Sequence, residues 1–141
     1  PDALGESLSV NKFISLISQE RRKIKQVLMD QEVIAGIGNI YADDTLWLAK
    51  IHPLRLANKL TPKEIKAIYV SMRSILAKSL ELRGTSISDF RDTSGKAGFY
   101  GDKRLVYRRE KEPCRRCGES IKRVKIGGRS SCYCPKCQSV Q

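Results

Sequence analysis

Apolar residues recur at helical spacing from Ser9 to about Leu80, with polar residues between them. Intervals of three and four residues place such positions on one face of a helix and predict four helices. Ser9 is a suitable cap for the first helix, and the basic run Arg21–Lys23 leads into the second. The apolar positions are, helix by helix, Val10, Phe13, Ile14 and Ile17; Ile24, Val27, Leu28 and Met29; Ile40, Leu46 and Trp47; and Ile65, Ile68, Tyr69, Met72, Ile75, Leu76 and Leu80.

Turn signals separate the predicted helices. Two glycines break the periodicity at Gly36–Asn39, and the third helix stops before His52–Pro53. Thr61–Glu64 has the pattern of a capping box, with proline at the first position of the fourth helix. These signals are typical of a helical bundle.

The chain changes character after Arg83. Residues 84–98 are rich in serine, threonine, aspartate and glycine, which predicts a flexible loop. Short strand-like runs follow near 99–100, 105–107, 121–126 and 130–133. We therefore predict a mainly α-helical bundle followed by a small β-hairpin module. The expected division of the chain is a helical domain over 1–83, a loop over 84–98 and a β-rich module over 99–141.

Charge points to a polyanionic partner. The 141 residues contain 27 Lys and Arg against 15 Asp and Glu, a formal net charge of +12. From Lys103 to Gln141 there are 12 basic and three acidic residues, which is +9 of that total. Nucleic acid is the first expected partner and an anionic membrane surface the second, although a solvated charged face is the plain alternative. No apolar run long enough for a membrane helix and no signal-peptide pattern occurs, so we expect neither a membrane span nor secretion.

Five cysteines lie in the last part of the chain and predict a metal site. Cys114 and Cys117 form one C-x2-C pair, and Cys134 and Cys137 form another after 16 residues. This spacing suits one structural zinc ion held by four thiolates. Disulfides and an iron–sulfur cluster are the alternatives, but disulfides need an oxidising compartment and five cysteines leave one unpaired. The fifth, Cys132, has the wrong spacing for either pair and is interpreted as a spare thiol.

The segment between the two cysteine pairs is long enough for a β-hairpin with Gly127–Gly128 at its tip. It carries four cations, so a hairpin stiffened by metal is suited to binding phosphates. Arg129 follows the tip glycines, where a guanidinium can reach a phosphate with two hydrogen bonds. The four cations are Lys122, Arg123, Lys125 and Arg129.

The glycine turn at Gly36–Asn39 has three possible interpretations. A dinucleotide-binding fingerprint would need a third glycine where Tyr41 stands and a strand before the turn. A plain turn between helices is the second. The third is a phosphate-binding turn, in which the N-terminal backbone N–H groups of the third helix and the Asn39 side chain converge. Lys25 and Arg21, expected on the preceding helix, would add positive charge.

Four stretches resemble the C-terminal half of bacterial formamidopyrimidine-DNA glycosylase, and together they cover nearly all of the chain. This resemblance implies the family's helix–two-turns–helix domain followed by its zinc finger. The stretches are Ile24–Gln31, Gly36–Asp43, Ile51–Arg55, and Glu112–Cys117 through Gly127–Arg129 to Cys134–Gln138.

The resemblance also implies roles for individual residues. Asn39 and Arg129 would bind the phosphates that flank the damaged nucleotide, with Lys25 nearby. Tyr107 and Arg123 would make further backbone contacts. Arg129 matches the proton donor of the family's δ-elimination step, and the loop over 84–98 corresponds to the segment that folds over the everted base.

Two residues depart from the family pattern. Asp44 replaces a glutamate that is usual there, which predicts altered hydrogen bonding. Cys132 stands where histidine is common, and a reactive thiol there would make the protein sensitive to oxidation.

The family's nucleophile is an N-terminal proline followed directly by glutamate, whereas Pro1 is followed by Asp2. The segment at Pro1–Gly5 matches the family's interdomain linker, so we expect the catalytic half to be absent from this sequence. The expected function is the DNA-binding half of a glycosylase and abasic-site lyase acting on oxidised purines, which alone binds DNA without turnover. The expected partners are double-stranded DNA with oxidised or abasic sites and the N-terminal catalytic domain, in a monomeric, cytoplasmic, nucleoid-associated bacterial protein. A stand-alone zinc-dependent nucleic-acid-binding protein is the alternative, and a ribosomal or transcription zinc ribbon is a third.

Overall fold

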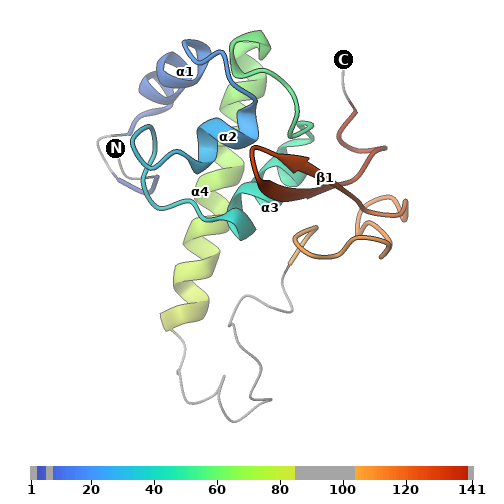
Figure 1. Ribbon diagram of the computed structural model, residues 1–141. Helices are drawn as coiled ribbons and strands as arrows, with labels where there is room; N and C mark the ends of the chain where they lie inside the picture. The colour runs from blue at the N-terminus through green and yellow to red at the C-terminus, as the bar shows by residue number, and fades with distance from the viewer. Residues whose placement is uncertain (1–2, 6–7, 85–103, 140–141) are drawn as a thin grey trace.

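The computed structural model describes residues 3–5, 8–84 and 104–139, and in this part of the chain helices come first and a β-hairpin last (Figure 1). This is the predicted fold class. Helix α4 runs the length of the bundle behind α2 and α3, and the hairpin lies beside α2 and α3 (Figure 1). The elements are α1 (Val10–Ser18), α2 (Ile24–Met29), α3 (Asn39–Ala49), the 3-10 helix η1 (Ala57–Lys59), α4 (Pro62–Gly84), β1 (Lys122–Ile126) and β2 (Arg129–Tyr133).

The predicted helix caps are confirmed. The Ser9 hydroxyl accepts the Lys12 N–H at 3.2 Å. In the capping box, the Thr61 hydroxyl accepts the Glu64 N–H at 3.1 Å, and the Glu64 carboxylate accepts the Thr61 N–H at 2.9 Å. Each bond gives a partner to an N–H that the helix itself leaves free, so these residues fix where α1 and α4 begin.

The main core lies where α1, α2 and α3 pack against α4. Phe13, Ile24, Leu28, Ile65 and Ile68 have no exposed surface there. Five of the predicted apolar positions, namely Val10, Ile14, Met29, Ile40 and Tyr69, are only half-buried because they lie at the edges of the buried helix faces. In the described residues no helix is long and apolar enough to cross a membrane.

The hairpin has the predicted tip. Strands β1 and β2 are antiparallel, with Ile126 opposite Arg129. Gly127 and Gly128 turn the chain with φ values of +57° and +83°, a left-handed geometry that favours glycine. A Cβ on Gly127 would lie 2.8 Å from the Gln26 Nε2 atom, so the tip lies against α2.

A second, smaller core joins the hairpin module to the bundle. Trp47 of α3 packs there with Val106, Ile121 and the cysteines Cys114 and Cys134. Helix α3 therefore contributes side chains to both cores. No contact of this kind could be predicted from periodicity along one helix.

The prediction of a strand at 105–107 is wrong. These residues form a turn, because their backbone N–H groups bind the Asp44 carboxylate and not a neighbouring strand. The predicted run at 99–100 lies outside the described residues, as does the predicted loop except Gly84, which is the last residue of α4. Among the described residues no strand precedes the Gly36–Asn39 turn, so the dinucleotide-binding interpretation has no support.

Candidate metal centre and nucleic-acid interface

Four cysteine sulfurs meet at one point between the hairpin ends. The Sγ atoms of Cys114, Cys117, Cys134 and Cys137 all lie within 4.8 Å of one another. The Cys114–Cys137 and Cys117–Cys134 separations are 3.9 and 3.4 Å. Tetrahedral zinc with Zn–S bonds of about 2.3 Å requires sulfurs about 3.8 Å apart, so the donor set fits zinc.

Hydrogen bonds orient the cysteine ligands. Burial acts to raise the pKa of Cys114, but the N–H groups of Cys117 and Arg116 and the indole of Trp47 outweigh it and lower that pKa to about 6. Burial raises the pKa of Cys134 to about 12. Four thiolates this close together repel one another, so a cation between them is needed to favour the ionised forms, and zinc supplies that charge.

Trp47 and Arg116 connect the cysteine cluster to α3, and the sequence analysis missed both roles. The Trp47 Nε1 donates to Cys114 Sγ at 3.2 Å. The Arg116 guanidinium lies 3.8 Å from the centre of the Trp47 ring and donates to the Trp47 carbonyl at 2.6 Å. An arginine between two cysteines gives no sequence signal for such a contact, because its partner lies in another domain.

Cys132, the residue expected to be a reactive thiol, is buried in the structure. Its side chain belongs to the second core, and the residue is 4% exposed. Burial raises the pKa of its thiol, and nearby Asp43 and Glu110 add to the effect. The thiolate is the reactive form of cysteine, so burial and a raised pKa both act against reactivity of this thiol, which borders the cavity described below.

Lys25 forms a buried ion pair with Asp43 that links three elements. The two side chains, on α2 and α3, are only 2% and 1% exposed. The same Asp43 carboxylate accepts the Ser131 hydroxyl at 2.7 Å and the Cys132 N–H at 3.0 Å, both on β2. Lys25, expected near phosphates, therefore points its ammonium into the protein, where it also lies 3.4 Å from the Ser130 carbonyl.

Asp44, the next residue, holds the chain at the start of the hairpin module. Its two carboxylate oxygens accept the N–H groups of Leu105, Val106 and Tyr107 at 3.0, 2.9 and 3.2 Å. The sequence predicted altered hydrogen bonding where aspartate replaces the usual glutamate. In the structure, Asp44 is buried and accepts three backbone N–H groups. Two adjacent acidic residues on α3 fix both sides of the module.

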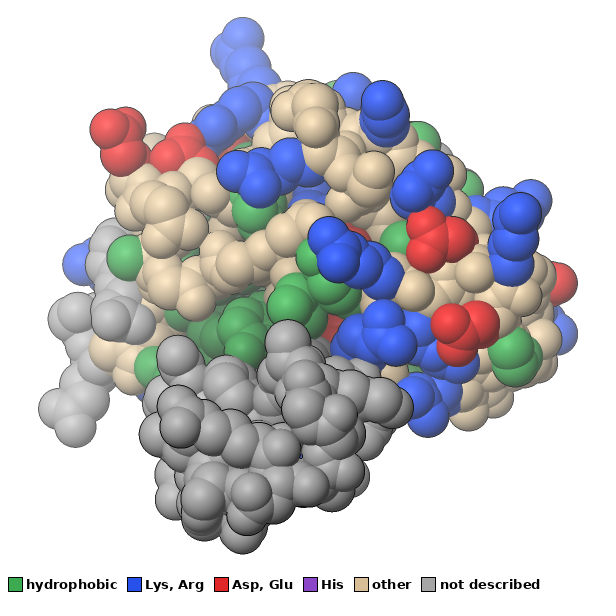
Figure 2. Space-filling model, turned by 60° about the horizontal axis from the view of Figure 1, so that its bottom comes forward, with side chains coloured by type: hydrophobic (Ala, Val, Ile, Leu, Met, Phe, Trp, Pro, Cys, Tyr) green, Lys and Arg blue, Asp and Glu red, His purple; other side chains and the backbone are tan. Residues whose placement is uncertain are grey.

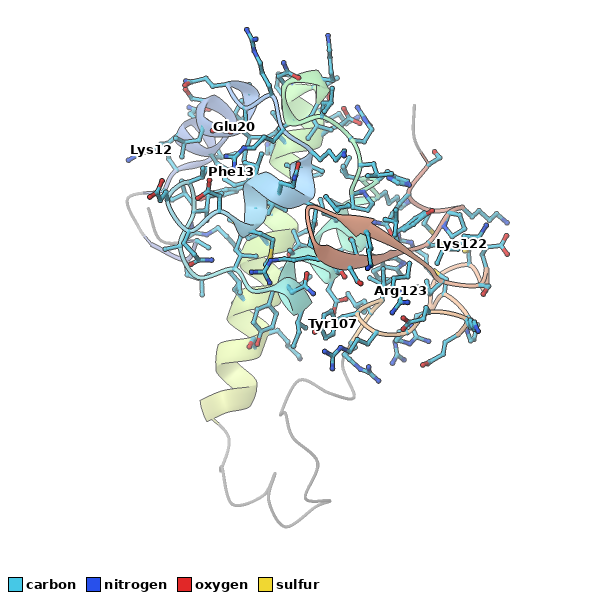
Figure 3. The ribbon with its side chains drawn as sticks, viewed as in Figure 1. Lys12, Phe13, Glu20, Tyr107, Lys122 and Arg123 are labelled. Atoms are coloured by element: carbon cyan, nitrogen blue, oxygen red, sulfur yellow. The ribbon has the colours of Figure 1, made fainter. Side chains whose placement is uncertain are left out.

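A cavity of about 320 Å³ lies between the N-terminus of α3 and the hairpin. It brings together Asn39, Tyr107, Arg123 and Arg129, four of the predicted contact residues. Figure 3 shows Tyr107 and Arg123 next to each other below the hairpin. In Figure 2, Lys and Arg side chains gather on the face shown, with acidic groups among them.

Asn39 borders this cavity, and the position of Gly38 before it is open. The Asn39 Nδ2 donates to the Ser130 carbonyl at 3.5 Å, whereas its Oδ1 is buried and has no hydrogen-bond partner in the described structure. Gly38 has φ −93°, which any residue adopts, and a Cβ there would meet nothing within 4 Å. The protein interior thus gives no reason for glycine at this position.

A second cavity, of about 280 Å³, lies between α2 and the hairpin tip. Arg129 borders both cavities. Arg22 borders the second and is paired with Glu20 at 2.8 Å and Asp30 at 2.9 Å. The expectation that Arg21 lies on the preceding helix is wrong: Arg21 is exposed in the connection before α2 and borders neither cavity, because α2 begins only at Ile24.

The comparisons with known proteins agree along the whole chain. Residues 1–91 match the family "Formamidopyrimidine-DNA glycosylase H2TH domain", and residues 111–140 match "Zinc finger found in FPG and IleRS". The latter match and the four converging thiols confirm the predicted structural zinc site.

Two relatives named formamidopyrimidine-DNA glycosylase illustrate the sequence similarity. The protein of Herpetosiphon aurantiacus is 45% identical over 99% of this chain and 51% of its own length. That of Pelotomaculum thermopropionicum is 48% identical over 96% of this chain and 50% of its own length. The chain therefore spans about half the length of the curated relatives it matches.

Solved structures show the same fold. The MutM (Fpg) protein from Thermus thermophilus superposes with a TM-score of 0.85 and 37% identity, over 98% of this chain and 53% of the other. The Lactococcus lactis Fpg in complex with DNA containing an abasic site gives a TM-score of 0.86 and 37% identity, over 99% of this chain and 51% of the other.

Proposed function

Because the chain belongs to the formamidopyrimidine-DNA glycosylase family, we propose that it is the DNA-binding half of a base-excision glycosylase and abasic-site lyase. The whole enzyme would turn an oxidised purine such as 8-oxoguanine or a formamidopyrimidine out of the duplex, cleave its glycosidic bond and cut the strand by β,δ-elimination. The nucleophile would come from an N-terminal catalytic half, so this chain alone binds double-stranded DNA with damaged or abasic sites without turnover. The protein would act as a monomer on the bacterial nucleoid.

The observation that carries the proposal is that Asn39 and Arg129 border one cavity although they are far apart in the sequence. The amide of Asn39 and the guanidinium of Arg129 are suitable donors to phosphate oxygens. The open space at Gly38 lets a phosphate approach the N-terminal N–H groups of α3, which a plain turn would not require.

The remaining predicted contacts have different parts in the proposal. Arg123 and Tyr107 border the cavity and would extend the backbone contact. Lys25 would act through Asp43, by holding β2 where Arg129 faces Asn39. Arg21, exposed before α2, would contribute only charge near the DNA. Arg129 would also donate the proton of δ-elimination in the whole enzyme.

The proposal predicts a specific salt dependence of DNA binding. We expect Arg129→Ala to weaken binding of the chain to an abasic-site duplex and to reduce the slope of log K against log salt by about 0.9, one phosphate contact. Lys122→Ala is the control, because Lys122 is an exposed cation on β1 that borders neither cavity. Equal slopes for the two variants, measured by fluorescence anisotropy, would contradict the proposal.

Borohydride trapping on an 8-oxoguanine duplex tests the catalytic part. The 141-residue chain should give no covalent adduct, and the same chain joined to a family catalytic half should give one. An adduct with this chain alone would make Pro1 a nucleophile. Binding without an adduct from the joined protein would favour the stand-alone DNA-binding alternative, and a preference for RNA would favour a ribosomal or transcription zinc ribbon.

A further inference from the structure

Arg108 adopts a backbone conformation that L-amino acids rarely occupy. Its φ is +54°, in the left-handed region, which glycine adopts readily and where a Cβ clashes with the backbone. Residues kept in such conformations cluster at binding and active sites, where the surrounding structure enforces them. Lys111, nearby in the chain, has φ +71° and allows a direct comparison.

The surrounding chain enforces this conformation from both sides. Before Arg108, the buried Asp44 carboxylate binds three successive N–H groups, the last of them that of Tyr107. After it, the buried Arg109 guanidinium donates to the Leu105 carbonyl at 2.7 Å and to the Pro113 carbonyl at 2.8 Å. The turn is thus fixed before any ligand binds, and the Arg108 side chain is presented from a rigid base.

The Arg108 side chain borders the same cavity as Asn39 and Arg129. It is exposed, and its guanidinium carbon lies 5.3 Å from the centre of the Tyr107 ring. No carboxylate in the described part of the chain lies within ion-pair distance of it, whereas Arg123 is paired with Glu110 at 3.2 Å. Asp43 and Glu110 also border the cavity, but they are paired with Lys25 and Arg123. Of the three arginines that border it, Arg108 and Arg129 therefore form no ion pair within the described residues.

We propose that Arg108 binds a backbone phosphate of the DNA strand that Asn39 and Arg129 hold. This inference rests on the proposed function and adds a contact that neither the sequence analysis nor the resemblance assigned. The ring of Tyr107 would keep the guanidinium facing the strand. The rare backbone conformation would be retained because it points this charge into the cavity.

The test compares Arg108→Gly with Lys111→Gly. Both changes remove one positive charge and place glycine at a left-handed position, but Lys111 is exposed and does not border the cavity. We expect both variants to keep or raise the midpoint of thermal unfolding, by up to about 5 °C. Only Arg108→Gly should weaken binding to an abasic-site duplex, by about 5- to 10-fold at about 0.15 M salt, with a salt slope smaller by about 0.9.

Two further variants keep the test decisive. Arg108→Asn removes the charge but tolerates a left-handed backbone, so it should reproduce the loss of binding without added backbone freedom. Arg108→Lys keeps the charge and should preserve the salt slope. Equal losses for the Arg108→Gly and Lys111→Gly variants would overturn the inference, because total charge would then explain both.

Arg129→Ala separates this inference from the proposed function. If Arg129→Ala weakens binding and Arg108→Gly does not, the Arg108 contact is wrong and the proposed function stands. If the parent chain does not bind the duplex at all, the proposed function itself has failed.

Discussion

At the scale of residues, the site depends on the buried charges of Lys25 and Asp43. Asp43 lies between α3 and β2 with one ion-pair partner and two hydrogen-bond donors. Burial raises the pKa of its carboxyl group, and the charge and hydrogen bond of Lys25 oppose that rise. A buried carboxylate held in this way fixes the distance between the elements that carry Asn39 and Arg129.

Removing the partner of Asp43 should therefore destabilise the fold. We expect Lys25→Met to lower the free energy of unfolding by about 3–5 kcal/mol, because it leaves a buried charge without its counter-ion. Arg22→Met is the matched control. Arg22 pairs with Glu20 and Asp30, but its side chain is 43% exposed, so the free energy of unfolding should fall by less than about 1 kcal/mol. Urea denaturation measures both, and similar losses would mean that Lys25 is not specially coupled to Asp43.

At the scale of elements, the start of α4 combines a helix cap with an ion pair. Glu64 completes the capping box and also receives two hydrogen bonds from the Arg55 guanidinium, at 2.9 and 3.1 Å. The Arg55 bonds, aided by the Thr61 N–H, hold the pKa of Glu64 below its ordinary value of 4.5 despite partial burial. One side chain thus joins the helix to the loop that precedes it.

This arrangement predicts a pH dependence of stability. A carboxyl group whose pKa is lowered by folding stabilises the protein above its unfolded pKa, and that contribution is lost as the pH falls through the folded pKa. We expect Glu64→Gln to cost about 1–2 kcal/mol at about pH 7. The difference from the parent chain should disappear as the pH is lowered below 4.5.

Denaturation of both proteins across this pH range is the measurement. Glu32→Gln is the control, because Glu32 is exposed and its carboxylate forms no ion pair in the described residues. A Glu64→Gln deficit that persists well below the folded pKa would show that lost packing, and not charge, is responsible.

At the scale of the whole molecule, the zinc module and the bundle share α3. Trp47 packs among the residues of the module, and Gln138 after the last cysteine donates to the Ile51 carbonyl at 2.9 Å. The His52 ring packs against Tyr133 at a tilt of 54°, with ring centres 4.4 Å apart. The two parts still have separate cores. The module is therefore attached to α3 but is not part of the α1–α2–α4 core.

Zinc removal should reveal this arrangement. The chain has one tryptophan, Trp47, whose indole contacts the zinc ligand Cys114. Chelation should shift Trp47 fluorescence to longer wavelength as the module unfolds, while most helical circular dichroism remains because the main core contains no cysteine among the described residues. Chelator already saturated with zinc is the control. A parallel loss of both signals would show that the bundle depends on the metal.

The sequence by itself determined the local features of this protein. Helix caps, apolar faces, the hairpin tip and the four zinc ligands follow from residues close together in the chain, where fixed backbone geometry sets which side chains meet. Residue types indicated Asn39 and Arg129 separately as phosphate ligands, and family resemblance added that the two bind the phosphates flanking one nucleotide.

Only the tertiary structure decided how these parts join. Several features depend on residues that are distant in sequence. They are the burial of Lys25 and Cys132, the turn at residues 105–107 that binds Asp44, the Trp47–Arg116 contact and the left-handed backbone of Arg108. A buried charge or backbone N–H pairs with a group that the packed fold brings near it. The periodicity of one helix or strand does not predict which group that is.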